Sequence, residues 1–392
     1  MTGLRETLRE IADSGPPIGG MAERAIRRAR RRRARAVFAP LLAAALVTAT
    51  VAVVTLVRPA DQEAVLGVPD QAITVAAEPP RPLPGGGTAP IVLAYTVQCD
   101  HRGVPGCAQW RVRTTEGAEF RVADGFEPDP RARMYAHLGA LAVSPDGTRL
   151  AYFDQDARLA VLDVTTGRKT LTAFPADRAA IGKDMVNITW SASGAWLSID
   201  FTPVYSAAPT PRAVVMDLAG RNITTLDAGC CVLGVADDGS YPVQAPAPPA
   251  KIFRPSEQAP LRMFEADGDS HAVVPSGAGA QEEGYPYLPA YARVSPDGTR
   301  LALLSNRGRN TELSLIDTAD GRVGPVHVPT QLQREEGPPE LAGWRDAATV
   351  LVWKRWSGAE VYAVDVNTAL TTRRLTFEGK TPFRISLATL LI

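Results

Sequence analysis

The chain has 392 residues, of which 45% are hydrophobic, 21% charged and 6% aromatic, and its 42 basic and 42 acidic residues cancel. This composition is typical of a folded protein and excludes a disordered or fibrous chain. A neutral total also argues against a dedicated nucleic-acid binder, which normally carries a basic excess. The length accommodates two or three ordinary domains or one large all-β domain.

The neutral total hides two segments of opposite charge. Residues 1–36 contain ten Arg and four acidic residues, a net charge of +6, so residues 37–392 carry −6. We expect residues 1–35 to form a basic leader, in which apolar positions at helical spacing predict a short helix over residues 2–13. The acidic remainder strengthens the expectation that the body binds no nucleic acid.

One uncharged segment, residues 36–57, reads AVFAPLLAAALVTATVAVVTLV. At about 1.5 Å rise per residue, this length spans a hydrocarbon core of about 30 Å. Eight Arg precede the segment closely and only Arg58 follows it closely. The positive-inside rule therefore predicts a single-pass helix with a cytoplasmic N-terminus and an extracytoplasmic body. A cleaved signal peptide and a nucleic-acid patch are the alternative interpretations of the Arg run.

Residues 58–90 show little periodicity and include the Pro/Gly-rich stretch RPLPGGGTAP. Such composition predicts a semi-rigid stalk between the membrane segment and a body spanning residues 91–392.

The body contains an internal repeat. Residues 143–151 and 294–302 both read VSPDGTRLA, and each copy is followed by an apolar strand pattern. Pro presets the turn dihedral, Asp favours the turn, and Gly permits a positive φ, so both copies predict a tight turn before a buried strand. The turn residues are Ser144, Pro145, Asp146, Gly147, Ser295, Pro296, Asp297 and Gly298.

A second pattern, a strand that ends near a polar turn, recurs six times at separations of 48 to 54 residues. Its marks are Arg113, Asp163, Asp217, Glu265, Asp317 and Asp365. An all-β body with this period predicts a β-propeller, most simply of six four-stranded blades, with a β-sandwich array as the alternative. The apolar residues 383–392, FRISLATLLI, are a spare strand that we expect to pair with the first blade and close the ring.

VSPDGTRLAYF at residues 143–153 and VSPDGTRLALL at residues 294–304 resemble repeats of the TolB-like and WD-repeat propeller families. The resemblance implies a membrane-anchored bacterial propeller with an inner strand after each SPDG turn. It implies no catalytic residues, because the SPDG motif is structural there. No Trp-Asp dipeptide ends a strand, which departs from the WD pattern.

The four cysteines form two close pairs. Outside the membrane, a disulfide between Cys99 and Cys107 is expected, and a zinc site that also uses His101 is the alternative. Cys230 and Cys231 are adjacent, and buried thiols, a vicinal disulfide or a bond to another chain all remain open.

Irregular loops in the fourth repeat contain Tyr285, Tyr287 and Tyr291, which we predict to shape a recognition face because tyrosines are common binding anchors. No hydrolase elbow, nucleotide loop or metal-ligand spacing occurs. We therefore expect no cofactor and no catalytic residue, and a binding or scaffold module for an unknown protein or envelope ligand.

A propeller lyase or hydrolase and a regulator signalling through the leader are the alternative functions. A cluster of His, Arg and carboxylates at one channel mouth would favour the enzyme, and a channel lined by small or apolar residues would favour binding.

Overall fold

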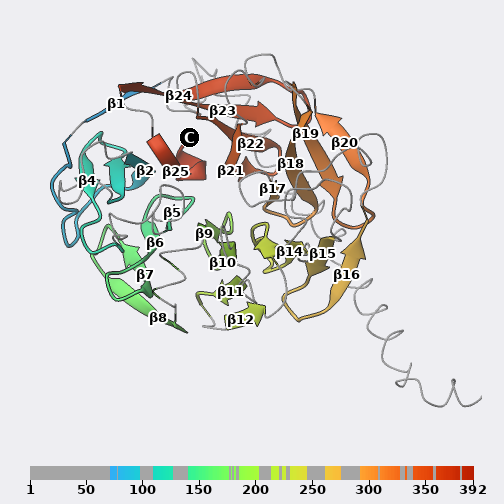
Figure 1. Ribbon diagram of the computed structural model, residues 1–392, viewed down its shortest axis with the longest axis horizontal. Coiled ribbons are helices and arrows are strands. Elements are labelled where there is room, and N and C mark those ends of the chain that lie inside the picture. Colours follow the sequence, from blue (N-terminus) through green and yellow to red (C-terminus); the bar gives the residue numbers. More distant parts are fainter. Residues whose placement is uncertain are drawn as a thin grey trace, which may run out of the picture. The chain divides into compact units, whose positions relative to one another are not determined.

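The computed structural model (Figure 1) describes residues 71–76, 78–97, 109–126, 140–175, 178, 181, 185–202, 213–219, 223–226, 230–244, 261–274, 292–307, 310–326, 332, 339–355, 359–379 and 382–392. The chain divides into two units, residues 1–66 and 67–392, and the described residues all belong to the second. The predicted leader (1–35) and transmembrane helix (36–57) lie outside the described residues. Within the ranges given above, no helix is long and apolar enough to cross a membrane.

The described strands form six sheets that follow one another around a central channel, as the blades of a propeller (Figure 1). Each sheet is given from the innermost strand outward. Blade 1 contains β25 (Pro382–Leu387), β2 (Ile91–Val97), β3 (Arg111–Thr114) and β4 (Glu119–Arg121). Blade 2 contains β5 (Leu141–Val143), β6 (Arg149–Phe153), β7 (Arg158–Asp163) and β8 (Lys169–Pro175). Blade 3 contains β9 (Met185–Trp190), β10 (Trp196–Thr202), β11 (Ala213–Asp217) and β12 (Ile223–Leu226).

The second half of the ring repeats this order. Blade 4 contains β13 (Cys230–Val232), β14 (Tyr241–Gln244), β15 (Leu261–Phe264) and β16 (Ser270–Val273). Blade 5 contains β17 (Ala292–Val294), β18 (Arg300–Arg307), β19 (Asn310–Asp317) and β20 (Val323–Val326). Blade 6 contains β21 (Glu340–Asp346), β22 (Thr349–Lys354), β23 (Glu360–Asp365), β24 (Thr371–Gly379) and an added outer strand, β1 (Gln71–Val75). The predicted six-bladed, all-β propeller is therefore confirmed.

The two SPDG turns join the innermost strand of a blade to the second strand, in blades 2 and 5. The strand after each turn, β6 or β18, is the second strand of its blade and lies between two others, whereas the innermost strand precedes the turn. In β6 the residues Leu150 to Phe153 are all buried, since β6 lies between two strands of its own sheet and two neighbouring blades. The identical turns are in blades 2 and 5, with two blades between them on either side, so they lie on opposite sides of the channel.

The ring closes through both ends of the described chain. β25 pairs antiparallel with β2, with Leu387 opposite Leu93, so the predicted closure by residues 383–392 is confirmed. β1 pairs in parallel with β24 and adds a fifth strand to the outer edge of blade 6. One closing strand therefore lies at the channel and the other at the rim.

Residues 71–90 belong to the propeller unit, so the predicted stalk over residues 58–90 does not extend through them. Ile73 and Val75 are buried in β1, and Pro82 forms a parallel bridge with Arg121 at the outer edge of blade 1. Gly87 donates its backbone N–H to Thr165 O in blade 2. The Pro/Gly-rich segment therefore follows the outer edges of blades 6, 1 and 2. Proline and glycine are tolerated there because an edge segment makes few hydrogen bonds with neighbouring strands.

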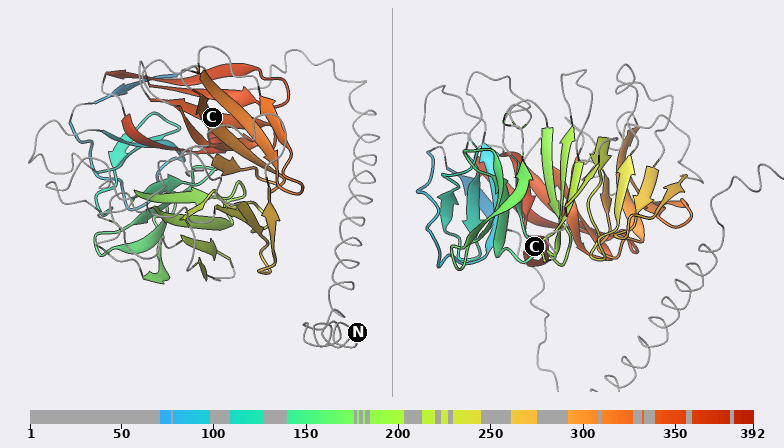
Figure 2. Two further views of the ribbon diagram at one scale, coloured as in Figure 1. Left: turned by 45° about the vertical axis from the view of Figure 1, so that its right-hand side comes forward. Right: turned by 90° about the horizontal axis from the view of Figure 1, so that it is seen from below.

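The hydrophobic core is divided into layers between blades. Among the described residues six buried clusters occur, and each joins two neighbouring sheets. The largest packs Phe153 and Leu159 of blade 2 against Leu197 and Ile199 of blade 3. Because each blade buries both faces against its neighbours, the ring is held by face-to-face packing. Seen from its edge, the sheets stand side by side around the ring (Figure 2).

Candidate functional site

The central channel contains a cavity of about 310 Å³, lined mainly by residues from the innermost strands of blades 1, 2, 3, 5 and 6 and the turns that follow them, and by Gly234 and Val235 after β13 of blade 4. A volume of this size is at the lower end of the range for small-molecule sites. The SPDG-type turns of neighbouring blades contact one another: Arg149 Nη2 donates to Gly194 O, and Ser193 N donates to Asp237 Oδ1. These turns therefore lie at one end of the channel, and the innermost strands begin at the other end.

The charged lining residues gather where the innermost strands begin. Glu340 is the first residue of β21, Arg293 is the middle residue of β17, and Arg384 is the third residue of β25. Arg355 follows β22 directly, beside the Trp353 that pairs with Glu340. Three blades thus bring three guanidinium groups and one carboxyl group to one end of the channel.

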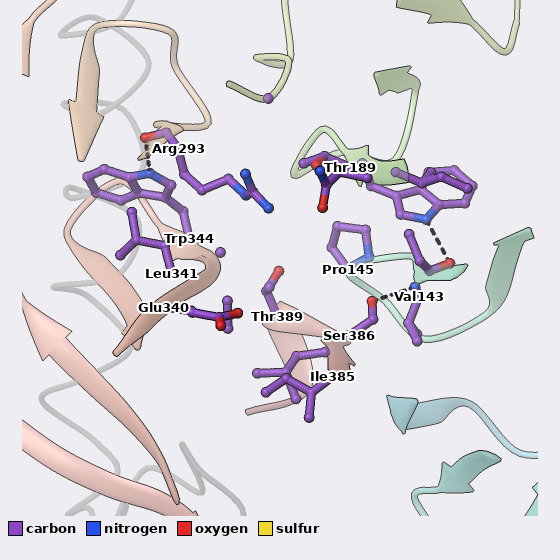
Figure 3. A pocket seen from close by; sticks show the side chains of 18 of the residues that line it. Val143, Pro145, Thr189, Arg293, Glu340, Leu341, Trp344, Ile385, Ser386 and Thr389 are labelled. Atoms are coloured by element: carbon purple, nitrogen blue, oxygen red, sulfur yellow. Dashed lines mark hydrogen bonds between the residues drawn. The ribbon is translucent and has the colours of Figure 1, made fainter. Parts of the chain in front are cut away.

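Two of these side chains are seen in Figure 3, where Arg293 and Glu340 point into the same cavity from β17 and β21. Arg384 reaches across the channel, because its Nη1 donates to the carbonyl oxygen of Val186 in blade 3 at 3.2 Å. The guanidinium of Arg384 therefore lies beside Asn187, the next residue of β9.

The protein environment opposes ionisation of these groups. Burial raises the pKa of Glu340, while the positive charges of Arg355, Arg384 and Arg293 partly offset that rise. Burial lowers the pKa of Arg293 to about 10, against the opposing effect of Asp200 and Glu340. Burial also lowers the pKa of Arg384. These shifts mark a poorly hydrated group of charges, in which electrostatic interactions with a ligand are strong.

Two neutral donors in the same lining have no hydrogen-bond partner among the described residues. Asn187 Nδ2 and Trp353 Nε1 are both buried and unpaired. A buried donor without a partner costs about 1–3 kcal/mol, so such groups commonly mark a place where a ligand or water binds.

Apolar side chains lie among the charged ones in the lining. Leu341 follows Glu340 in β21 and Ile385 follows Arg384 in β25, while the indole N–H of Trp344 donates to Arg293 O at 2.9 Å (Figure 3). The short helix η4 (Thr389–Leu391) lies beside the SPDG turn of blade 2, where Leu390 N donates to Pro145 O at 3.0 Å. The cavity lining therefore combines charged and apolar side chains.

Only part of the predicted site falls on the described chain. Pro145 and Pro296 of the two SPDG turns line the cavity, and Asp146 and Asp297 hold the turns beside it. Residues Tyr285, Tyr287, Tyr291, Cys99 and Cys107 lie outside the described residues, so the recognition loops and the disulfide stay predictions. Cys230 and Cys231 lie in β13, the innermost strand of blade 4.

Sequence reasoning missed the charged residues of the channel. Arg293 stands between Ala292 and Val294, and Arg384 lies in an otherwise apolar terminal strand. An isolated Arg in a short apolar strand was the available signal. Within the described ranges no group of three or more His, Cys, Asp or Glu could hold a metal ion.

Fold and site define a six-bladed β-propeller with a small polar and apolar cavity in its channel. A family model described as the lipoprotein LpqB beta-propeller domain matches residues 290–378, which span blades 5 and 6. No curated protein matches the chain.

Among solved structures, TolB from Acinetobacter baumannii is 16% identical, with 78% of this chain and 68% of that chain covered and a TM-score of 0.45. A TolB candidate from Agrobacterium tumefaciens is 13% identical, with 76% and 92% covered and a TM-score of 0.44. An oligogalacturonate lyase from Vibrio parahaemolyticus is 11% identical, with 73% and 79% covered and a TM-score of 0.44. The propeller assignment itself rests on the sheet topology.

Proposed function

We propose that this chain is a membrane-tethered, extracytoplasmic binding module that holds a ligand in its propeller channel. The observation that carries the proposal is the cavity of about 310 Å³, on which side chains from several blades converge. Arg293, Glu340 and Arg384 are charged groups brought inside the ring, where they serve no inter-blade hydrophobic layer. A concave site with a few convergent polar groups is the usual form of a ligand-binding site.

The tether and the extracytoplasmic location belong to the proposal. The Arg-rich residues 1–35 and the uncharged residues 36–57 support them through the positive-inside rule. The match of residues 290–378 to a propeller domain named for a lipoprotein also supports a place in the cell envelope. The predicted recognition loops around Tyr285 would add a second contact surface for a protein or envelope ligand.

The proposed activity is binding without chemistry. Most of the described cavity lining is apolar or small, as expected of a binding channel, and its polar groups are guanidinium, amide, hydroxyl and indole groups around the single carboxyl of Glu340. A second candidate is a propeller lyase or hydrolase, because Arg side chains and a carboxyl group do cluster at one end. Glu340 would then act as the general base, since burial raises its pKa.

The proposal is tested on the full-length protein extracted from its own envelope in mild detergent. Native mass spectrometry of the intact protein is compared with that of the Arg293→Gln variant. We expect a defined mass to accompany the wild-type protein and to be lost from the variant. If the wild-type protein is folded and no bound mass accompanies either protein, the binding function is refuted. Release of that mass in altered form, dependent on Glu340, would favour the enzyme.

A further inference from the structure

We infer that the channel cavity takes an uncharged, polyhydroxylated ligand of about the size of one sugar ring, an inference that rests on the proposed binding function. Its hydroxyl groups would accept hydrogen bonds from Asn187 and Trp353 and donate hydrogen bonds to Glu340. All three side chains line the cavity of about 310 Å³. A cavity at the lower end of the range for small-molecule sites suits a single ring rather than a chain of rings.

The two unpaired donors belong to opposite sides of the ring. Asn187 lies in β9 of blade 3 and Trp353 in β22 of blade 6, with two blades between them on either side. Asn187 Nδ2 and Trp353 Nε1 are buried and have no hydrogen-bond partner among the described residues. A ligand that satisfies both donors therefore carries acceptor oxygens on two of its sides.

The two sides lie at a similar depth along the channel. Trp190 of blade 3 and Trp344 of blade 6 hold equivalent positions, because each donates its indole N–H to the middle residue of the innermost strand of the preceding blade. Asn187 precedes Trp190 by three residues, and Glu340 precedes Trp344 by four, of which the bulge in β21 takes up one. Trp353 is the ladder partner of Glu340. One level of the cavity therefore brings together Asn187, Glu340 and Trp353.

The charges around the cavity favour an uncharged ligand. Arg293, Arg355 and Arg384 each have interaction partners within the protein, so none of them requires an anion from outside. An anionic ligand would lie beside the carboxyl group of Glu340, and a cationic ligand would lie among the guanidinium groups. Either charge would also lose its hydration in the channel, whereas a neutral hydroxyl loses much less.

Hydroxyl groups match the mixture of donors and acceptors. The Asn187 Nδ2 and Trp353 Nε1 groups can only donate, and an ionised carboxyl group can only accept. A hydroxyl does both, so one ligand with several hydroxyls can pair with all three side chains. Ser386 lines the same cavity (Figure 3), and its Oγ accepts a hydrogen bond from Val143 N at 2.9 Å, so its own O–H can donate to a ligand oxygen.

The test follows the indole N–H of Trp353 by heteronuclear NMR. The full-length protein is isotope-labelled at its tryptophan indole nitrogens and kept in a detergent without a sugar head group, after dialysis. The Trp353→Phe variant assigns the signal. The neutral probes are D-glucose, D-galactose and D-mannose, and the charged probes are the uronate and the 2-amino derivative of each sugar, at about pH 6, where the amine is protonated.

We expect at least one neutral hexose to shift the Trp353 signal and to bind about tenfold more tightly than its two charged derivatives. Absence of a shift with all three neutral hexoses would overturn the inference. Tighter binding of a uronate or an amino sugar than of the parent hexose would overturn it as well.

Matched variants locate the site. Asn187→Ala should weaken hexose binding about tenfold with little change in melting temperature, because the lost amide donor has no partner in the described protein. Asn367→Ala changes an exposed asparagine in the turn after β23 and should leave binding unchanged. A lower melting temperature of Asn187→Ala with unchanged binding would show that the amide is structural and would contradict the site.

Glu340→Gln tests the carboxyl group. The change keeps the shape of the side chain and removes its charge, so the uronate should bind the variant more tightly than the wild type, and the amino sugar more weakly. The opposite changes would contradict the position of Glu340 beside the ligand.

Failure of this inference differs from failure of the proposed function. If no hexose binds but a defined mass still accompanies the protein from its own envelope, the ligand class is wrong and the binding function stands. If neither a hexose nor an envelope ligand binds the folded protein, both fail.

Discussion

Arg149 and Arg300 occupy the same position in the two identical nine-residue segments, and each reaches into the next blade. The guanidinium of Arg149 stacks on Trp190 at 4.8 Å and donates to Gly194 O at 2.8 Å, both in blade 3. Trp190 in turn donates its indole N–H to Ala142 O of blade 2 at 3.1 Å. The interaction therefore joins the two blades in both directions.

Blades 5 and 6 repeat this arrangement. Arg300 lies over Trp344 at 6.0 Å and donates to Ala347 O, while Trp344 donates to Arg293 O. The recurrence explains why Arg belongs to the repeated motif: it fixes the orientation of the following blade rather than the turn itself. The carboxylates and glycines of the motif hold the turn.

We expect Arg149→Gln to lower the free energy of unfolding by about 1–2 kcal/mol, through loss of a cation–π contact and a charge-assisted hydrogen bond. The midpoint of urea denaturation measures the change. Trp190→Phe should cost a similar amount, and the double variant should cost less than the sum because both remove one interaction. Additive costs would show that Arg149 and Trp190 act independently.

Asp146 and Asp297 organise the two turns from inside. Each carboxylate accepts hydrogen bonds from the Ser hydroxyl before it and from the Thr after it. Gly147 has a φ of +73°, and a Cβ there would lie 2.4 Å from Ile91 O. Glycine is therefore required both by the turn and by the close approach of blade 1.

These hydrogen bonds make part of the stability dependent on pH. Burial raises the pKa of Asp297, but hydrogen bonds from Ser295 and Thr299 and the charge of Arg300 outweigh it and hold the pKa below its usual value. A carboxyl group with a lowered pKa in the folded state stabilises the fold above its unfolded pKa, near 4. That stabilisation is lost as the pH falls through the lower, folded pKa.

Asp297→Asn should consequently cost about 1 kcal/mol of stability near neutral pH. The cost should shrink below about pH 4, where the wild-type carboxylate also takes up a proton. Melting temperatures between about pH 7 and pH 3 test this prediction. Asp156→Asn is the control, because Asp156 is 71% exposed and bonded through its side chain to Arg158. An equal cost at every pH would contradict the role of the charge.

Among the elements, β25 and β1 close the same ring at different radii. β25 supplies the innermost strand of blade 1, and Leu387 of β25 and Ile392 after η4 are buried in the layer shared with blade 6. β1 lies at the outer edge of blade 6, where Ile73 and Val75 belong to that same layer. Removal of β25 also exposes the edge of β2, whereas removal of β1 exposes an edge already at the rim.

We expect deletion of residues 383–392 to lower the melting temperature sharply, because it removes a whole strand and opens the ring at the channel. The matched change is replacement of Ile73 and Val75 by Ser, which weakens β1 without shortening the chain and should cost less. Differential scanning calorimetry compares the three proteins. A deletion that melts with the wild type would refute closure by β25 as a source of stability.

The elements that sequence could predict are those specified by nearby residues. The SPDG turns and the polar ends of β7 and β19 are local sequence patterns. Residues 383–392 could be predicted to close the ring because a spare apolar strand needs another strand to pair with. β1 has no such mark, because its partner Leu375–Gly379 lies far along the chain. The sequence also did not predict Arg293 and Arg384 as site residues, because only the closed ring brings these two isolated arginines to one cavity.

At the scale of the whole chain, charge is divided between two segments. Residues 1–36 carry +6 and residues 37–392 carry −6, with the uncharged residues 36–57 at the division. If that segment spans a membrane, the basic side remains in the cytoplasm and the acidic propeller is exported. The channel then faces the extracytoplasmic space, where its ligand would be found.

This topology predicts that protease added to intact cells removes an epitope tag fused after Ile392. The tag should be cleaved without detergent, while a tag placed before Met1 should be cleaved only after lysis.

Replacement by Gln of the eight arginines that precede the segment should reduce the cleaved fraction, because the charge difference across it disappears. These are Arg24, Arg27, Arg28, Arg30, Arg31, Arg32, Arg33 and Arg35. Eight Arg→Gln changes within the propeller form the control, since charges distant from the segment contribute little to orientation. A C-terminal tag protected in intact wild-type cells would place the channel in the cytoplasm and overturn the proposed location.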